Sequence, residues 1–450
     1  MPGLSYVITI SLMYSYLFFT DLKMASKVGE RFELVADEEL RVEVDLVKQD
    51  ETCLVELVNG VAEIFGTEMV KDFKYKFYHG NKFSIYTYHG CSVNIYGQNQ
   101  ISPYTSKEHP MIQYLNIHHA LETKRKEADD NDSKFGPKVM VVGPQDVGKT
   151  TVCRLLVNYA VRQGRRPIFV DLDVGQNTLS VPGTISATLI ERPTSIEEGF
   201  PQNAPLVYHY GHSNPKENTV LYDSVVSSMA KVVLQRLTDY SKAKKSGAII
   251  NTCGVRGGVR GGGYDQLKHI AEAFDVNVII VLDQEQMYNY LKKDLPHKTV
   301  IWLPKSNGVV ERTQEQRLED SSTSIKHYYY GFQNSLLPYT FDVKFSEIKE
   351  KIYKIGAPNL PESCMPLGKT ADDNQTKLVA VSLTPKDLLN HVLAISHADS
   401  KDDLLSTNVN GFVVVTDVNV KESKISVLSP QPKPLPATLL LLSDIKYIDR

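Results

Sequence analysis

The stretch KVMVVGPQDVGKTTVCRLLVNYAVRQG, residues 138–164, decides the fold of this chain. It begins with a short apolar run, passes through a loop that contains two glycines, and continues with apolar residues at helical spacing. The loop from Gly143 to Thr150 has the pattern G-x-x-x-x-G-K-T, whose backbone N–H groups bind phosphate oxygens at the start of a helix. The stretch therefore predicts a P-loop between a buried strand and a helix, with Lys149 on the β- and γ-phosphates of ATP and the Thr150 hydroxyl on Mg²⁺.

The surrounding sequence predicts a doubly wound, mainly parallel α/β domain. Short runs that are apolar on both faces alternate with helical segments between residues 138 and about 303, and their sequences are KVMVVG, RPIFVDLD, GAIINTCG, VNVIIVLD and TVIWLP. Strands of this kind are covered by helices on both faces of a sheet. Trp302, in the last of these runs, is expected to be a core residue.

The second of these runs ends in DLDVGQ, with carboxylates at Asp171 and Asp173. Ligands of open α/β sheets bind at the carboxyl ends of the strands, so Asp173 is a candidate metal anchor or general base, and Gln176 lies in the same turn. The alternative is a pair of solvated acids that cap the end of a strand. Later in the chain, Arg312 and Arg317 begin a polar helical segment that could close over the phosphates as a lid. An exposed helix of mixed charge is the alternative there.

Sequence patterns on both sides of the P-loop region predict two further domains. Period-two alternation from about Phe32 to Val93, with turns at Asn59-Gly60, His79-Gly80 and His89-Gly90, indicates a small antiparallel β domain. A helical stretch follows at 109–126, and the charged run at 127–138 is predicted to be a linker. Strand-like alternation returns after about residue 333. The predicted domains are thus 24–126, 127–332 and 333–450, after an extension at 1–23.

Composition leaves the choice of partner open. The 450 residues carry 50 basic and 53 acidic side chains, so any nucleic-acid site must be a local patch. The five cysteines have no C-x-x-C spacing, which argues against a zinc site and favours a reducing compartment. Residues 4–19 are apolar but lack a basic flank and are too short to span a membrane. These residues are either an extension upstream of the folded protein or a signal or anchor segment. We expect no membrane partner.

The combined motifs resemble a known family, the polyribonucleotide 5′-hydroxyl kinase subunit of the messenger-RNA 3′-end cleavage factor. The resemblance rests on the P-loop stretch together with DLDVGQ, VPGT, INTCG, LDQE and LPKSNGVVER, and it extends to ELRVEV, PMIQYLN and FSEIKEKIYKIGAP outside the kinase region. It covers essentially everything after Met24. It implies an α/β P-loop kinase domain between an N-terminal β-rich domain and a C-terminal α+β or β-rich domain.

The resemblance also implies site residues. Those expected around ATP are Glu39, Lys82, Gly143, Asp146, Val147, Gly148, Lys149, Thr150 and Thr151. Those expected to act in catalysis are Lys149, Asp173, Gln176, Arg312 and Arg317, with Thr150 and Asp173 on Mg²⁺. Gln176 and Ser213 are expected to contact the substrate.

The activity implied is ATP-dependent phosphorylation of the 5′-hydroxyl end of RNA. The implied partners are a cleavage-factor subunit with other 3′-end processing proteins, and the transfer-RNA splicing endonuclease. The implied location is the nucleus. A catalytically weak or inactive ATP-bound scaffold subunit of the same factor is the alternative.

The sequence departs from the family in one loop. After INTCG the family has a tryptophan in a loop that clasps the RNA end, whereas residues 255–264 here read VRGGVRGGGY. Loss of a base-stacking platform removes about 1 to 3 kcal/mol of binding free energy. Arg256 and Arg260 are candidate substitutes for it, as is Tyr264; an inserted glycine loop or an error in the gene model would also explain the difference.

Overall fold

The computed structural model describes residues 29–45, 51–97, 101–202, 204–255, 263–356, 374–436 and 439–449. These residues divide into two compact units, within 1–109 and within 110–450, and each is described by itself. The apolar segment 4–19 and the two arginines of the glycine loop, Arg256 and Arg260, lie outside the described ranges. Within those ranges, no helix combines the length and the apolar composition that crossing a membrane requires.

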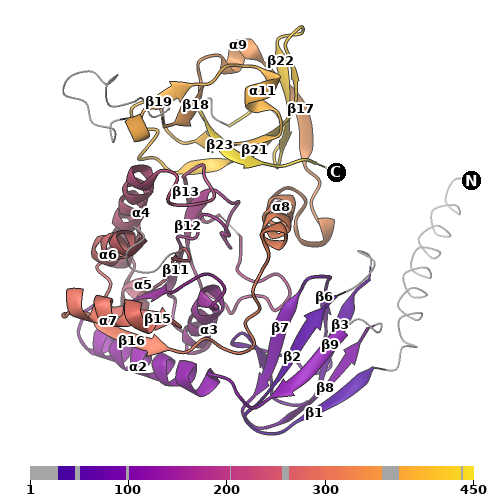
Figure 1. Cartoon of the computed structure of the whole chain (residues 1–450), viewed down its shortest axis with the longest axis vertical. Helices are drawn as coiled ribbons and strands as arrows, with labels where there is room; N and C mark the ends of the chain where they lie inside the picture. The colour runs from indigo at the N-terminus through magenta and orange to yellow at the C-terminus, as the bar shows by residue number, and fades with distance from the viewer. Residues whose placement is uncertain are drawn as a thin grey trace, which may run out of the picture. The chain divides into compact units, whose positions relative to one another are not determined.

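The first unit consists of two antiparallel sheets, as the alternating sequence predicted (Figure 1). One sheet has the order β1 (Glu30–Leu34), β8 (Cys91–Tyr96), β3 (Cys53–Gly60) and β6 (Lys74–Phe77). The other has the order β5 (Thr67–Glu68), β4 (Glu63–Ile64), β7 (Lys82–Thr87), β2 (Glu38–Val44) and β9 (Ile101–Ser106). Alternate side chains of β3 and β6 are buried, and the rings of Phe77 on β6 and Phe83 on β7 stack with their centroids 3.7 Å apart. The two sheets therefore pack face to face around a common core.

The second unit begins with helix α2 (Met111–Asp130), which is longer than the predicted helix and takes in the first residues of the predicted linker. That part of the linker prediction was wrong. Glu122 and Arg125 of α2 are buried, and Glu122 pairs with both Arg125 and Arg165, so the charged side chains hold the helix against the domain. The residues at the start of the predicted linker, 127–130, instead form the last turn of α2.

A seven-stranded sheet forms the centre of the second unit. Its order is β13 (Leu206–His209), β12 (Thr184–Leu189), β11 (Ile168–Asp171), β14 (Ala248–Asn251), β10 (Lys138–Val142), β15 (Val278–Leu282) and β16 (Thr299–Leu303). β10, β11, β14, β15 and β16 are parallel, while β12 and β13 form an antiparallel extension of the sheet. The predicted doubly wound, mainly parallel sheet is confirmed.

Helices cover this sheet on both faces. Its helices and helical turns are α3 (Lys149–Arg162), α4 (Thr219–Asp239), α5 (Ser241–Ser246), α6 (Gly263–Ala273), α7 (Glu285–Asp294), α8 (Gln314–Tyr330) and η1 (Phe332–Asn334). The chain crosses from β10 to β11 through α3 and returns from β13 to β14 through α4, in the opposite direction along the sheet. Because such crossovers are right-handed, the two helices lie on opposite faces (Figure 1).

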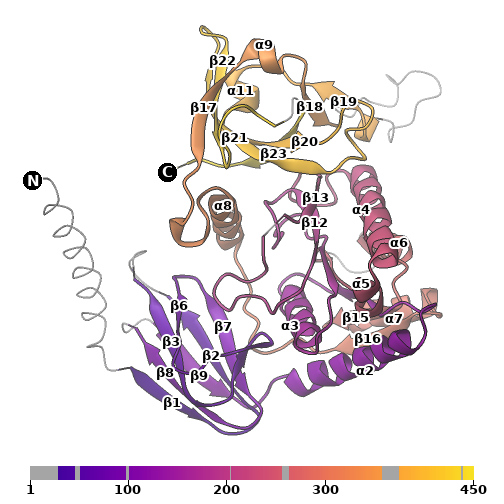
Figure 2. The ribbon, with the colours of Figure 1, turned by 180° about the vertical axis from the view of Figure 1, so that it is seen from behind.

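The C-terminal part is a second seven-stranded sheet. Its order is β17 (Tyr339–Lys344), β22 (Lys424–Ser429), β21 (Val409–Asn419), β20 (His391–Ser396), β23 (Leu440–Lys446), β18 (Ile352–Ile355) and β19 (Leu378–Ala380), with the short helices α9 (Phe345–Ile348) and α11 (Pro385–Leu388) (Figure 2). Successive residues of its strands face different cores. Ala394, Phe412 and Leu441 join the apolar core of the kinase region, whereas Leu393 and Val413 face a separate core. One face of this sheet therefore continues the core of the P-loop domain.

This shared core gives a test of how the C-terminal sheet contributes to stability. Phe412 is 3% exposed and its ring contacts that of Tyr328 on α8, with centroids 5.6 Å apart. We expect Phe412→Ala to lower the free energy of unfolding by about 3 to 5 kcal/mol, because it leaves a cavity between the two parts. Chemical denaturation followed by circular dichroism measures the change. Val420→Ala, at an exposed position, is the control and is expected to change the free energy by less than about 0.5 kcal/mol.

Candidate active site

The P-loop connects β10 to α3 with its glycines in conformations that other residues avoid. Gly148, the N-cap residue of α3, has φ 86° and ψ 22°, in the left-handed region. This conformation lets the chain enter the helix with its first N–H groups directed outward, and those groups carry the partial positive charge of the helix N-terminus. Lys149 follows directly, is buried, and donates a hydrogen bond from Nζ to the Pro144 carbonyl at 2.6 Å. The structure thus builds the loop geometry that the motif predicted.

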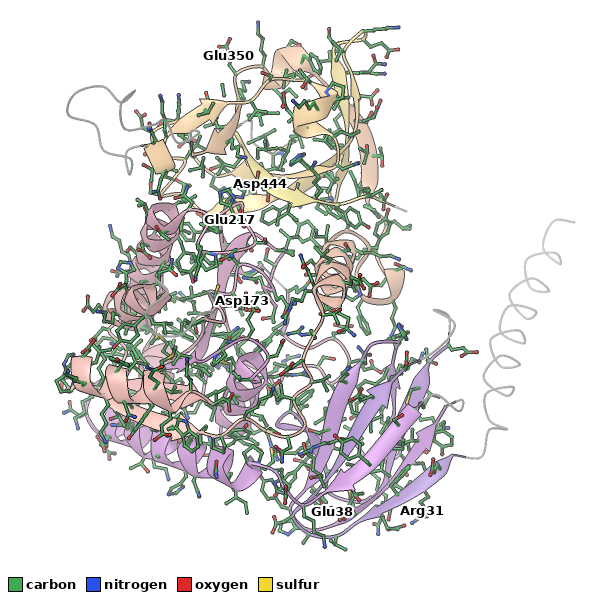
Figure 3. The ribbon with its side chains drawn as sticks, viewed as in Figure 1. Arg31, Glu38, Asp173, Glu217, Glu350 and Asp444 are labelled. Atoms are coloured by element: carbon green, nitrogen blue, oxygen red, sulfur yellow. The ribbon has the colours of Figure 1, made fainter. Side chains whose placement is uncertain are left out.

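Asp173 lies near Lys149 in the turn after β11. Burial lowers the pKa of Lys149, and the negative charge of Asp173 opposes that shift. Asp173 Oδ1 accepts hydrogen bonds from the backbone N–H groups of Gly175 at 3.0 Å and Gln176 at 3.2 Å. These bonds fix the carboxylate in the turn, and Figure 3 shows it inside the P-loop domain. Gln176 Nε2 is buried and has no hydrogen-bond partner among the described residues, so this amide remains available for a substrate.

Asp171, the other carboxylate of the pair, is fully buried. Its side chain accepts hydrogen bonds from the backbone N–H groups of Asp173 and Thr178 and from the Thr178 hydroxyl. Burial, followed by the charge of Asp173, raises the pKa of Asp171 to about 6. The alternative of two solvated acids is therefore wrong for Asp171. This residue organises the turn from within the protein instead of facing solvent.

The two predicted lid arginines both contact the P-loop. Arg317 donates a hydrogen bond through Nη2 to Asp146 Oδ2, and Arg312 Nε lies 3.6 Å from Asp146 Oδ1. Burial opposes the ionisation of Asp146, but the hydrogen bonds from Arg317 and Arg312 outweigh it and hold its pKa below the usual value. Arg312 precedes α8, and Thr313 caps that helix through a reciprocal pair of hydrogen bonds with Gln316. The start of α8 therefore holds both arginines beside the phosphate-binding loop.

The loop that carries Ser213 lies against the Asp173 turn on one side and the C-terminal sheet on the other. A Cβ added at Gly175 would lie 3.0 Å from the Ser213 carbonyl oxygen, so any side chain there would press on the Ser213 loop. Next to Ser213, His212 Nδ1 lies 2.8 Å from Asp444 Oδ2, and Lys354 Nζ lies 2.7 Å from Asp444 Oδ1. These contacts hold the pKa of Asp444 below its usual range, the hydrogen bond with His212 contributing most. Figure 3 shows Asp444 beside Glu217, where β23 meets the start of α4.

Three other predictions from the sequence need correction or remain untested. Trp302 lies on β16, at the edge of the sheet, and is 42% exposed, so its assignment to the core was wrong. Tyr264 is buried and donates a hydrogen bond to Asp294 at 2.9 Å, so it does not replace the missing stacking tryptophan. In the first unit, Glu39 is buried and paired with Arg41, while Lys82 is paired with Glu43. Their role in ATP binding stays a prediction.

The residues around the P-loop suit ATP with Mg²⁺. Hard oxygen ligands are what Mg²⁺ prefers, and the Thr150 hydroxyl and the Asp173 carboxylate supply them beside the loop. Asn251, at the end of the neighbouring strand β14, is fully buried, and its side-chain oxygen Oδ1 has no hydrogen-bond partner among the described residues. No role was predicted for Asn251, because neither composition nor spacing reveals which strand lies next to the P-loop.

Three family models match the chain over these same parts. They describe the N-terminal β-sandwich domain of polyadenylation factor (residues 33–128), the P-loop of the mRNA cleavage and polyadenylation factor CLP1 (143–331) and the pre-mRNA cleavage complex II protein Clp1 (336–449). A CLP1 homolog from Anopheles gambiae is 53% identical over 93% of this chain and 97% of that protein.

The chain belongs to the Clp1 family.

Other members of the Clp1 family support the same assignment. The Gallus gallus polyribonucleotide 5′-hydroxyl-kinase Clp1 is 51% identical over 93% of this chain and 96% of that protein. A solved complex of wild-type Clp1p with Pcf11p matches with a TM-score of 0.80 and 26% identity, over 94% of this chain and all of that one. A second solved structure, described as showing an extended interface between Pcf11p and Clp1p and the structural basis for ATP loss in a point mutant, also matches with a TM-score of 0.80 and 26% identity. The predicted family and fold class are confirmed.

The contacts of Asp146 give a prediction about the lid. We expect Asp146→Asn to loosen the start of α8, because it removes the charge that holds Arg312 and Arg317. Trypsin should then cleave after these arginines several times faster, as measured by mass spectrometry of timed digests without nucleotide. Glu311→Gln is the control, because the Glu311 side chain is 85% exposed and its ion pair among the described residues is with Lys305, at 3.7 Å, and not with Asp146. Equal cleavage rates for wild type and Asp146→Asn would contradict the assigned contact.

Proposed function

We propose that this protein is an ATP-dependent kinase that phosphorylates the 5′-hydroxyl end of RNA. The observation that carries the proposal is the shared location of the P-loop, the Asp173 turn and the lid arginines at one edge of the sheet. The name of the Gallus gallus relative, at 51% identity, supports the choice of a 5′-hydroxyl acceptor. The scaffold function remains the alternative, and the altered loop at 255–264 is the sequence feature that favours it.

Phosphoryl transfer needs positioning and charge stabilisation more than covalent chemistry by the protein. In the proposed reaction the 5′-oxygen of RNA forms a bond to the γ-phosphorus of ATP, and the bond from that phosphorus to the β–γ bridging oxygen breaks. Asp173 accepts the proton of the attacking hydroxyl, and ADP leaves with the bridging oxygen. Mg²⁺, held through Thr150 and Asp173, would neutralise charge on the β- and γ-phosphates.

The remaining side chains orient the reactants. Lys149 exchanges its hydrogen bond with the Pro144 carbonyl for one with a phosphate oxygen. Gln176 has a free buried amide beside Asp173 and is suited to position the acceptor end of RNA. Arg312 and Arg317 lie close enough to the P-loop to stabilise the transferring phosphoryl group, with Asp146 setting their position. Ser213 lies on the adjacent loop and is a candidate substrate contact.

The same proposal extends to partners and location. The solved relatives were studied with Pcf11p, and two of the matching family models describe a messenger-RNA cleavage factor. We therefore propose a cleavage-factor subunit as a partner and messenger-RNA 3′-end formation in the nucleus as the setting. Association with the transfer-RNA splicing endonuclease rests on the family resemblance alone, as do the roles of Glu39 and Lys82. Arg256 and Arg260, in the loop that departs from the family, are proposed RNA contacts on the basis of their charge alone.

Substitution of the P-loop lysine tests the kinase activity. We expect Lys149→Ala to reduce transfer of label from γ-labelled ATP to a 5′-hydroxyl oligoribonucleotide by about 100-fold or more, because it removes a cation that stabilises the transferring group. Lys134→Ala is the control, since the Lys134 side chain is 54% exposed and pairs only at the surface with Glu127. Wild-type protein that binds ATP but phosphorylates neither RNA nor DNA would reject the kinase and favour the scaffold.

Substitution of the proposed base separates binding from chemistry. Asp173→Asn keeps the shape of the side chain and an oxygen that can accept the hydrogen bonds of the turn, but it cannot take up a proton. We expect it to lower kcat by about 10²- to 10⁴-fold while the protein still binds ATP. Single-turnover transfer at saturating ATP, together with a direct measurement of ATP affinity, checks this. A variant with near wild-type kcat would remove Asp173 from the base role.

A further inference from the structure

The end of β14 occupies a special place in the sheet. β14 lies between β10, which leads into the P-loop, and β11, which leads into the Asp173 turn. Its last residue, Asn251, pairs in register with Val141 on one side and Asp171 on the other. Parallel strands that end together bring their following loops to one edge of the sheet. The Asn251 side chain therefore lies between the two loops that carry the proposed ATP and Mg²⁺ groups.

The amide nitrogen of Asn251 joins these two loops. Nδ2 donates a hydrogen bond to the Thr150 hydroxyl at 3.2 Å and another to Asp171 Oδ1 at 2.9 Å. Asp171 Oδ1 also accepts the backbone N–H of Asp173 at 3.1 Å. A continuous chain of hydrogen bonds thus runs from the Thr150 hydroxyl, through Asn251 and Asp171, to the backbone of Asp173.

The orientation of the Asn251 amide follows from these partners. An ionised carboxylate is only an acceptor, so the amide must present its N–H groups, and not its oxygen, to Asp171. Both Nδ2 protons are then used, and Oδ1 is left as the buried oxygen without a partner. A buried acceptor without a partner is unfavourable, so this oxygen is expected to be satisfied by a ligand or by water.

The hydrogen bond to Thr150 also matters for cation binding. A hydroxyl has one donor and two acceptor lone pairs. When Asn251 Nδ2 occupies one lone pair, the other is left for a cation, and the hydroxyl proton is directed elsewhere. Mg²⁺ in phosphate-binding sites usually keeps several of its waters and takes only one or two protein ligands. Such waters need acceptors beside the direct ligands.

We propose that Asn251 is a positioning residue of the Mg²⁺·nucleotide site: its Nδ2 orients Thr150 and Asp171, and its Oδ1 accepts a hydrogen bond from a cation-bound water. Asp171 takes part as the fixed carboxylate behind Asn251, since its oxygens are occupied by donors from Asp173, Thr178 and Asn251. The inference deepens the proposed function and rests on it for the identity of the ligand. It links the group that holds the cation to the backbone of the proposed base.

The test measures nucleotide binding without RNA and without turnover. The dissociation constant of ADP is determined by calorimetry in Mg²⁺ and again in EDTA, and the ratio of the two constants reports the contribution of the cation. We expect Asn251→Ala to reduce this ratio by about 10-fold or more, the usual effect of removing a residue that orients metal ligands. The affinity in EDTA should change little. An unchanged ratio in folded Asn251→Ala protein would overturn the proposal.

Two further variants keep the test decisive. Thr252→Val removes the hydrogen bond from the next residue to the Val141 carbonyl, at 2.8 Å, and should lower stability without changing the ratio. A lower ratio in this control would show that loosening of the strand end is sufficient, which contradicts the specific role of Asn251. Asn251→Leu has nearly the same side-chain volume but offers neither an N–H donor to Thr150 and Asp171 nor an oxygen to a cation-bound water. We expect it to lower the ratio by about 10-fold or more, so an unchanged ratio overturns the proposal even if Asn251→Ala does not fold.

The outcomes also separate this inference from the proposed function. A wild-type protein that binds ADP more tightly in Mg²⁺ but transfers no phosphate would reject the kinase and leave the role of Asn251 standing. If the wild-type protein transfers phosphate normally and the Asn251 variants keep the wild-type ratio of ADP dissociation constants, only the role of Asn251 is rejected and the kinase proposal stands.

Discussion

The arrangement of the whole site depends on one constraint, the hydrogen bonding of β14 to both β10 and β11. Because this strand lies between them, the P-loop and the Asp173 turn leave the sheet two strands apart and face each other across Asn251. A strand spacing of about 4.8 Å sets the scale of that separation. The gap is one that a single asparagine side chain can bridge, and a longer or shorter residue at position 251 would not satisfy both neighbours. The chemistry of the site thus begins with backbone pairing.

Much of this arrangement could be predicted from the sequence, for identifiable reasons. The P-loop is a local motif, and its strand, loop and helix are contiguous, so Gly148, Lys149 and Thr150 could be placed from spacing alone. The runs that are apolar on both faces indicated a parallel sheet covered on both sides. The alternating residues before Val93 predicted antiparallel strands, because a period of two survives in any sheet with one buried face.

The remaining features depend on contacts between distant residues, which spacing does not show. Trp302 looked like core because its run is apolar, but β16 is the last strand of its sheet among the described residues, and the Trp302 side chain is 42% exposed. Residues 127–130 looked like the start of a linker because the run they begin is charged and turn-prone, but they continue helix α2. Tyr264 was a candidate for stacking on RNA, although its hydroxyl is held by Asp294 from α7. Asn251 was missed because strand order is invisible in a sequence.

Opposite charges in the site are balanced within the protein, and this balance bears on how a nucleotide could enter. Asp146 of the P-loop pairs with Arg312 and Arg317, and Lys149 bonds a carbonyl of its own loop. A phosphate group that binds here offers the same cations a stronger anion, so binding exchanges existing contacts for new ones.

The net gain in binding free energy is smaller than the sum of the new contacts, because each old contact must be given up. In exchange, the arginines and the lysine are already within reach of the loop, which lowers the entropy lost when they engage the phosphates. Asp146 occupies one of the x positions of the G-x-x-x-x-G-K-T pattern, and its charge holds Arg312 and Arg317. The position of the lid therefore depends on the sequence of the P-loop itself.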